Sequence, residues 1–156
     1  MPYSLMSVED IAALPVDGLA AADCHLFLWC TRKVFREGQG ADVARAWGFE
    51  PCGEIIWGLR NPGMGQVLGN DHEPVLIARR GNLPFTRGVR LIGCHFWRQT
   101  YALGKRGKAH SAKPEAFMDL VESVSPGPYV ELFSRRHRLG WDVWGNESAN
   151  TAEMPA

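Results

Sequence analysis

The stretch YVELFSRRH (residues 129–137), followed closely by WDVWGNE (residues 141–147), decides the fold of this chain. The first segment begins as an apolar strand, with Val130, Leu132 and Phe133 as expected core residues, and it ends in polar side chains. The second segment is an aromatic strand that ends in Gly-Asn-Glu. Open α/β sheets form nucleotide-type sites where strands end in converging hydrogen-bonding groups. The two segments therefore predict an α/β sheet with a ligand site at its strand ends.

Helical and strand-like segments alternate along the rest of the chain. This alternation predicts a mostly parallel sheet flanked by helices, in one domain over residues 1–148 with a disordered tail at 149–156. The near-continuous apolar run CHLFLWC at 24–30 predicts a strand that is buried on both faces. The other elements are a helix capped by Ser7, helices at 40–47 and 114–124, strands at 54–59, 74–79 and 91–96, and a loop at 60–71.

The composition indicates a soluble globular protein of a single domain. The chain has 156 residues, of which 46% are hydrophobic and 22% are charged. It contains neither an apolar run long enough to span a bilayer nor a basic N-terminal export signal, so we expect a cytoplasmic protein without membrane contact. The four cysteines lie far apart and are expected to be reduced thiols. A zinc site built from Cys24, His25, Cys94 and His95 lacks metal-type spacing, so no metal is predicted.

The formal net charge of zero conceals one strongly basic segment. Residues 79–138 hold 12 Lys/Arg against 4 Asp/Glu, a balance of +8, whereas residues 1–78 carry −5 and the remaining residues carry −3. Cations interleaved with aromatic rings suit phosphate contacts and base stacking. The alternative is a solvated loop whose cations bind nothing. On the first interpretation the nucleic-acid-binding residues include Arg98, Lys105, Arg106 and Lys108, which lie near aromatic residues.

Lys113 stands immediately before Pro114, at the expected start of a long helix. An ammonium group at the positive end of a helix dipole costs a few tenths of a kcal/mol unless an anion lies there too. Helix N-termini bind carboxylates and phosphates, so Lys113 is a candidate contact for an anionic group of a ligand. An exposed lysine that points away from the helix explains the sequence equally well.

Short motifs in a fixed order give the chain a resemblance to a known family. It resembles the N6-adenine methyltransferases typified by the catalytic subunit of the mRNA N6-adenosine methyltransferase, in a bacterial or phage-like form. The resemblance covers nearly the whole chain. The matching blocks are PYSLMS at 2–7, LFLW at 26–29, AWGF at 46–49, NDHE at 70–73, HSAKPE at 110–115, SPG at 125–127, ELFSR at 131–135 and WGN at 144–146.

The resemblance implies a Rossmann-like methyltransferase fold that uses S-adenosylmethionine to methylate the exocyclic amine of adenine in nucleic acid, DNA rather than RNA. It assigns Lys113 to the methionine carboxylate of the cofactor. Arg138 stands where relatives can have an asparagine that contacts the ribose. The segments 98–110, with His110, and 60–72 would flank the entering nucleic acid. The remaining cofactor-binding residues implied by the resemblance, near the ribose, are Glu131, Arg135, His137, Asn146 and Glu147.

The catalytic motif of that family, Asp-Pro-Pro-Trp, should lie upstream of residues 2–7, so the resemblance implies that it is missing here together with a central strand. Asn61-Pro62-Gly63-Met64 follows the wrong strand and lacks the second proline, so we reject it as a substitute. No residue of this chain is therefore assigned a catalytic role. Three explanations remain: a truncated gene product, a partner chain that supplies the strand, or a non-catalytic nucleic-acid-binding or accessory subunit. The first predicts little methyl transfer by the isolated chain.

Overall fold

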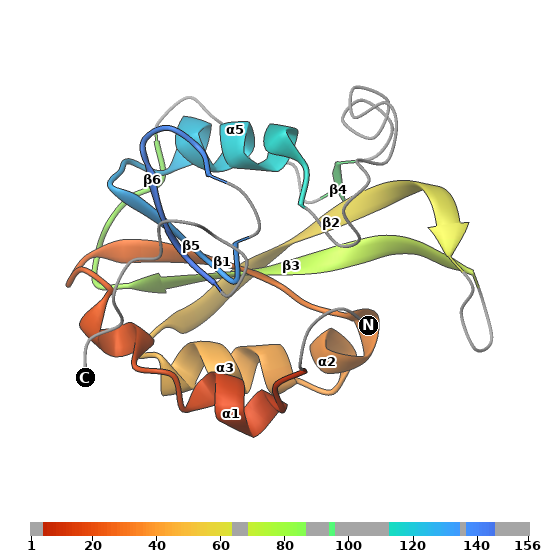
Figure 1. Cartoon of the computed structure of the whole chain (residues 1–156), viewed down its shortest axis with the longest axis horizontal. Coiled ribbons are helices and arrows are strands. Elements are labelled where there is room, and N and C mark those ends of the chain that lie inside the picture. The colour runs from red at the N-terminus through yellow and green to blue at the C-terminus, as the bar shows by residue number, and fades with distance from the viewer. Residues whose placement is uncertain (1–4, 64–68, 87–93, 96–112, 135–136, 146–156) are drawn as a thin grey trace.

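The computed structural model describes residues 5–63, 69–86, 94–95, 113–134 and 137–145, and these form a mixed α/β structure (Figure 1). The predicted α/β class is therefore confirmed. The predicted tail at 149–156 lies outside the described residues. The elements in chain order are α1 (Val8–Ala12), a 3-10 turn η1 (Val16–Gly18), β1 (Cys24–Trp29), α2 (Arg32–Arg36), α3 (Gln39–Ala46), β2 (Glu50–Gly63), β3 (Asn70–Arg80), β4 (Cys94–His95), α5 (Glu115–Val124), β5 (Tyr129–Leu132) and β6 (Trp141–Trp144).

The described strands form two separate sheets. One has four strands in the order β1-β3-β2-β4, and the other pairs β5 with β6. The β2–β4 and β5–β6 pairs are parallel, but β3 runs antiparallel to both β1 and β2. The prediction of a mostly parallel sheet is thus wrong for the described strands. The reason is that β2 and β3 are consecutive strands that pair directly, without the helical crossover that a parallel pair requires.

Helices cover both faces of the four-stranded sheet. Figure 1 shows α5 on one side and α1, α2 and α3 on the other. Alternate side chains of β1 enter the two layers: Leu26 and Leu28 pack into the cluster that contains α3, and Phe27 and Trp29 pack into the cluster that contains α5. This period of two follows from the pleat of a strand. The sheet is therefore the middle layer of three.

Local sequence signals explain where the helices begin and end. The Ser7 hydroxyl accepts a hydrogen bond from the Asp10 amide at 3.0 Å, and the Asp10 carboxylate accepts one from the Ser7 amide, which forms a capping box before α1. Gly48, with a φ of 80°, follows the end of α3 and takes the left-handed conformation that glycine permits. The three predicted helices are confirmed to within a few residues at their ends. The short helix α2 was not predicted.

Two groups of apolar residues are less buried than the sequence suggests. All six residues of β1 are only half-buried, although the apolar run predicted burial on both faces. Val130 and Phe133, expected in the core, are 40% and 44% exposed. The physical reason is shared, because among the described strands β1 and β5 each have a pairing neighbour on one side only.

The strand boundaries also differ from the expectation. β2 and β3 extend well into the predicted loop at 60–71, and Figure 1 shows them extending together beyond the helices. Of the predicted strand at 91–96, the structure describes only Cys94–His95 as β4. Within the described part of the chain, no helix is both long enough and apolar enough to cross a membrane.

Candidate cofactor site

A cavity of about 780 Å³ lies between β1 and β5. It is lined along the whole of β1, by β5, and by side chains of α5 such as Phe117 and Met118. Lys113 and Glu131, two of the predicted cofactor residues, both line it although they belong to different segments. Cavities of this size, apolar with a few converging polar groups, are typical of small-molecule and cofactor sites.

Lys113 is held at one end of this cavity by two contacts. Its Nζ donates to Glu73 Oε2 at 2.7 Å, and the same atom lies 4.3 Å from the centre of the Trp29 ring. About 29% of the Lys113 side chain and 35% of the Glu73 side chain are exposed, so the pair is half-buried. Glu73 is thus the anion that compensates an ammonium at the start of α5. Lys113 does not point away from the protein, which was one of the two alternatives.

Glu131 enters the cavity from β5. Its Oε2 accepts a hydrogen bond from the Ser134 hydroxyl at 2.9 Å. Phe133, between them, has a φ of 58°, a left-handed conformation that is uncommon for a residue other than glycine. After this turn, Ser134 is 1% exposed, and its amide donates to the Trp144 carbonyl of β6 at 3.1 Å. A carboxylate has acceptor capacity for more than one donor, so the Ser134 bond leaves Glu131 chemically able to accept from a ligand hydroxyl.

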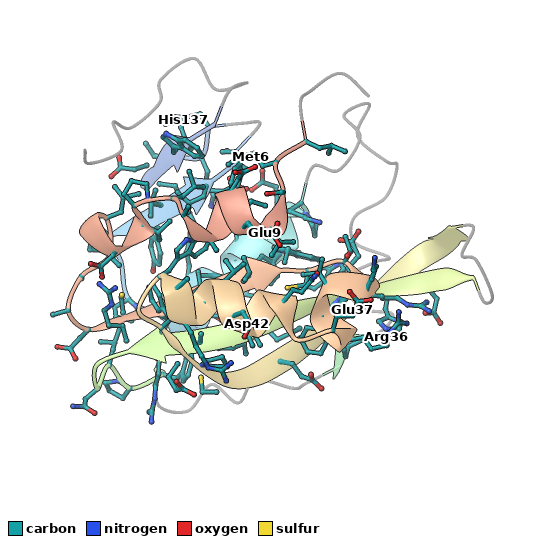
Figure 2. All side chains as sticks on the ribbon, turned by 90° about the horizontal axis from the view of Figure 1, so that it is seen from below. Met6, Glu9, Arg36, Glu37, Asp42 and His137 are labelled. Atoms are coloured by element: carbon teal, nitrogen blue, oxygen red, sulfur yellow. The ribbon has the colours of Figure 1, made fainter. Side chains whose placement is uncertain are left out.

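The other predicted cofactor residues are not brought to this cavity by the described structure. His137 is exposed and does not line the cavity. Figure 2 shows His137 on the outer side of the molecule, well away from Arg36 and Glu37 of α2. The predicted residues Arg135, Asn146 and Glu147, and the predicted nucleic-acid contacts Arg98, Lys105, Arg106, Lys108 and His110, lie outside the described residues.

Arg138 has a structural role in place of a ribose contact. Its guanidinium forms ion pairs with three carboxylates on one face of α5, those of Glu115 at 2.7 Å, Asp119 at 2.7 Å and Glu122 at 2.9 Å. Glu122 also accepts a hydrogen bond from the Trp141 indole at 2.7 Å. The Trp141 indole and then the Arg138 guanidinium lower the pKa of Glu122. These contacts tie the segment between β5 and β6 to α5.

Sequence reasoning did not assign cofactor roles to several residues in or near the cavity. Glu73 and Trp29, which contact Lys113, are examples, although both belong to blocks that carry the family resemblance. His25, which was weighed only as a zinc ligand, instead makes two hydrogen bonds: its Nδ1 lies 2.8 Å from the Ser125 hydroxyl and its Nε2 lies 2.9 Å from the Leu83 carbonyl. A carbonyl only accepts, so Nε2 carries the proton. Among the residues that the structure describes, no group of three or more His, Cys, Asp or Glu side chains could hold a metal ion.

A sequence model of the MT-A70 family matches residues 1–147. The chain belongs to the MT-A70 family. This family membership confirms the resemblance to the N6-adenine methyltransferases that the sequence motifs indicate.

The chain is also similar to individual members and relatives of the MT-A70 family. It is 31% identical to the type II methyltransferase M.MunI of Mycoplasma sp, over 98% of this chain and 63% of that protein. It is 30% identical to the N(6)-adenosine-methyltransferase MT-A70-like protein of Drosophila melanogaster, over 94% of this chain and 24% of that protein. It is 27% identical to the human N(6)-adenosine-methyltransferase catalytic subunit METTL3, over 94% of this chain and 25% of that protein. The chain thus spans less than two thirds of each of these relatives.

Proposed function

We propose that this MT-A70 family chain is a methyltransferase domain that uses S-adenosylmethionine to methylate the N6 amine of adenine in nucleic acid, with DNA as the favoured substrate. The observation that carries the proposal is the convergence of Lys113 and Glu131 on one cavity of about 780 Å³. The two groups lie on different elements, and a ligand that carries both a carboxylate and a ribose has a partner for each.

The chemistry of the donor set fits this cofactor. The Lys113 ammonium would hold the methionine carboxylate, and the Glu131 carboxylate would accept hydrogen bonds from the ribose hydroxyls. Before the cofactor binds, Glu73 would orient the ammonium, because its carboxylate holds the Lys113 Nζ at a distance of 2.7 Å. When bound, S-adenosylmethionine supplies an activated methyl group on its sulfonium. Arg135, Asn146 and Glu147 remain proposed contacts on the ribose side, whereas His137, which does not line the cavity, would reach the ribose only from its rim.

Adenine as the target is supported by the names of the relatives. Human METTL3 is named as an N(6)-adenosine-methyltransferase, and a 26% identical human relative, METTL4, as an N(6)-adenine-specific methyltransferase. The basic balance of residues 79–138 suits a polyanionic substrate. If that substrate is duplex DNA, the target adenine must leave the base stack, because its amine is paired inside the duplex.

The proposal extends to the finer fold and to the compartment. Helices on both faces of the sheet and the parallel β2–β4 and β5–β6 pairs support a Rossmann-like methyltransferase arrangement. Cys24, Cys30 and Cys52 are free thiols, and burial raises the pKa of Cys30 to about 11, so this thiol stays protonated at neutral pH. Free thiols support a location in the reducing cytoplasm.

Calorimetric titration of the chain with S-adenosylmethionine tests the cofactor site. We expect Lys113→Ala and Glu131→Gln each to weaken binding by about 10-fold to 100-fold, the range for a hydrogen bond to a charged group. Lys33→Ala and Glu54→Gln serve as matched controls, since both side chains are exposed and do not line the cavity. Equal affinity for wild type and both cavity variants would contradict the site.

A second measurement separates this proposal from the accessory-subunit alternative. Binding of a DNA oligonucleotide is measured at several salt concentrations alongside the cofactor titration, and transfer of a labelled methyl group to adenine is measured in the same samples. Cofactor binding that depends on Lys113 supports the methyltransferase domain. Salt-dependent DNA binding without any cofactor binding would instead establish a nucleic-acid-binding subunit.

A further inference from the structure

Ser134 is a buried polar residue in the turn that follows β5. It is 1% exposed, and its hydroxyl oxygen lies 2.9 Å from Glu131 Oε2. Because an ionised carboxylate only accepts hydrogen bonds, the hydroxyl is the donor. Serine hydroxyls in turns often bond to neighbouring backbone groups, but this one donates to the side chain of a candidate cofactor residue. The Ser134 hydroxyl therefore bears on what Glu131 can bind.

The end of β6 holds the backbone of Ser134 in place. The Ser134 amide donates to the Trp144 carbonyl at 3.1 Å, which continues the parallel pairing of Leu132 with Trp144. Gly145 approaches the same residue closely, because a Cβ on Gly145 would lie 2.7 Å from the Ser134 carbonyl oxygen. Both contacts are made within the protein. The position of the hydroxyl is therefore set by the β5–β6 unit and does not depend on a ligand.

The bond from Ser134 orders the Glu131 carboxylate and leaves its second oxygen for a ligand. Glu131 lines the cavity, whereas Ser134 does not. Within the part of the chain that the structure describes, Ser134 is the one side chain that hydrogen-bonds Glu131. A glutamate side chain has several rotatable bonds, and ordering them when a ligand binds costs conformational entropy. A carboxylate that is ordered beforehand avoids part of this cost, so it binds a ligand more tightly.

We propose that Ser134 is a positioning residue for the cofactor. Its hydroxyl holds Glu131 Oε2, so that Oε1 can accept hydrogen bonds from the ribose hydroxyls of S-adenosylmethionine. Ser134 does not line the cavity, so it acts through Glu131 and is not a catalytic residue. The identity of this ligand rests on the proposed function, whereas the contact between Ser134 and Glu131 does not.

A serine with a purely structural role would behave differently. If the hydroxyl only satisfied buried polar groups in the turn, its removal would lower the stability of the fold and affect every ligand of the cavity alike. A positioning role makes the effect specific. Removal of the hydroxyl then matters only while Glu131 is present, and only for a ligand that carries ribose hydroxyls.

Calorimetric titration with S-adenosylmethionine tests the role of Ser134. We expect Ser134→Ala to weaken binding about 3-fold to 10-fold, the range for the net contribution of one hydrogen bond. In a Glu131→Ala background, the same substitution should change the affinity by less than about twofold. An analogue of S-adenosylmethionine in which hydrogen replaces both ribose hydroxyls should bind wild type and Ser134→Ala equally.

Ser123→Ala is the matched control and should leave the affinity unchanged. Its exposed hydroxyl also makes one hydrogen bond within the protein, to the Leu120 carbonyl at 2.7 Å, but Ser123 does not line the cavity. Ser134→Cys provides a second variant in case Ser134→Ala does not fold. Cysteine is close to serine in volume but is a weak donor, so we expect the same loss of affinity.

Three results would overturn the inference. Ser134→Ala and Ser134→Cys could both bind S-adenosylmethionine like wild type, the loss could persist without Glu131, or the analogue without ribose hydroxyls could lose affinity by the same factor. The proposed function fails on a different result, namely that Lys113→Ala and Glu131→Ala leave the affinity for S-adenosylmethionine unchanged.

Discussion

β3 and β5 each contain a short apolar stretch, yet these stretches differ sharply in burial. In β3, Val75 is fully buried and Ile77 is 5% exposed, whereas in β5 Val130 is 40% exposed and the adjoining Phe133 is 44% exposed. β3 lies between β1 and β2, with helices on both faces, while β6 is the one described strand that pairs with β5. The comparison shows that neighbours, rather than composition, decide how much a strand buries. The following predictions alter or sharpen this difference.

The largest effect is expected for Val75→Ala in β3. Removing two methyl groups from a fully buried site should lower the free energy of unfolding by about 2–3 kcal/mol, because the transfer free energy is lost and a cavity remains. Chemical denaturation followed by tryptophan fluorescence measures the change. A loss below about 0.5 kcal/mol would show that β3 is not packed between its neighbours as described.

Gly145→Ala should have the next largest effect, since it acts on the β5–β6 unit. A Cβ at this position would lie 2.7 Å from the Ser134 carbonyl oxygen and 2.9 Å from the Ser134 nitrogen, so the backbone must shift. We expect a loss of about 1–3 kcal/mol in unfolding free energy. Gly53→Ala is the control, because its Cβ would meet nothing closer than Ile77 at 3.8 Å. Equal stability of the two variants would contradict this packing.

Arg138→Gln should have a smaller effect, because surface ion pairs contribute little. The variant should melt at a lower temperature than wild type at pH 7, with Arg36→Gln as an exposed control. The pKa of Glu122 lies below its ordinary value of 4.5 in the folded protein, chiefly through the Trp141 indole and then through Arg138. The stabilisation is therefore present above pH 4.5 and is lost as the pH falls through the lowered value. A gap between variant and wild type that widens at acid pH would contradict the ion-pair assignment.

Val130→Ala in β5 should have the smallest effect. Val130 is 40% exposed, so the same change that is costly in β3 should alter the unfolding free energy by less than about 1 kcal/mol. Denaturation of the chain alone measures this. A large cost in the chain alone would mean that β5 is already packed on its open edge.

The sequence predicted what depends on local chemistry. The Ser7 cap, the Gly48 stop and the apolar run of β1 all act within a few residues, and the structure confirms the corresponding elements. Pairing direction was predicted wrongly, because β2 and β3 pair across a connection whose length and conformation the sequence pattern does not reveal. The burial of β1 was also overestimated, since an apolar run does not state how many neighbours a strand has.

In the candidate site, too, the residues with a local signal were predicted, and the contacts between distant residues were not. Lys113 stood out because a lysine before a helix needs a nearby anion, and Glu131 stood out as a carboxylate on an apolar strand. The prediction that both side chains bind the same ligand depended on the resemblance to a family. Glu73, the partner of Lys113, is 40 residues away in sequence. No local pattern links residues at that separation, so only the folded chain shows this contact.

The hydrogen bond between His25 and Ser125 joins residues that are 100 positions apart. This bond lies where α5 packs against the sheet. The chain between residues 25 and 125 must therefore close into a long loop before α5 gains its contacts with β1. Proteins dominated by such distant contacts fold slowly. During that interval the apolar strand at residues 24–29 is without its helical cover, which makes low temperature and low protein concentration the natural conditions for refolding this chain.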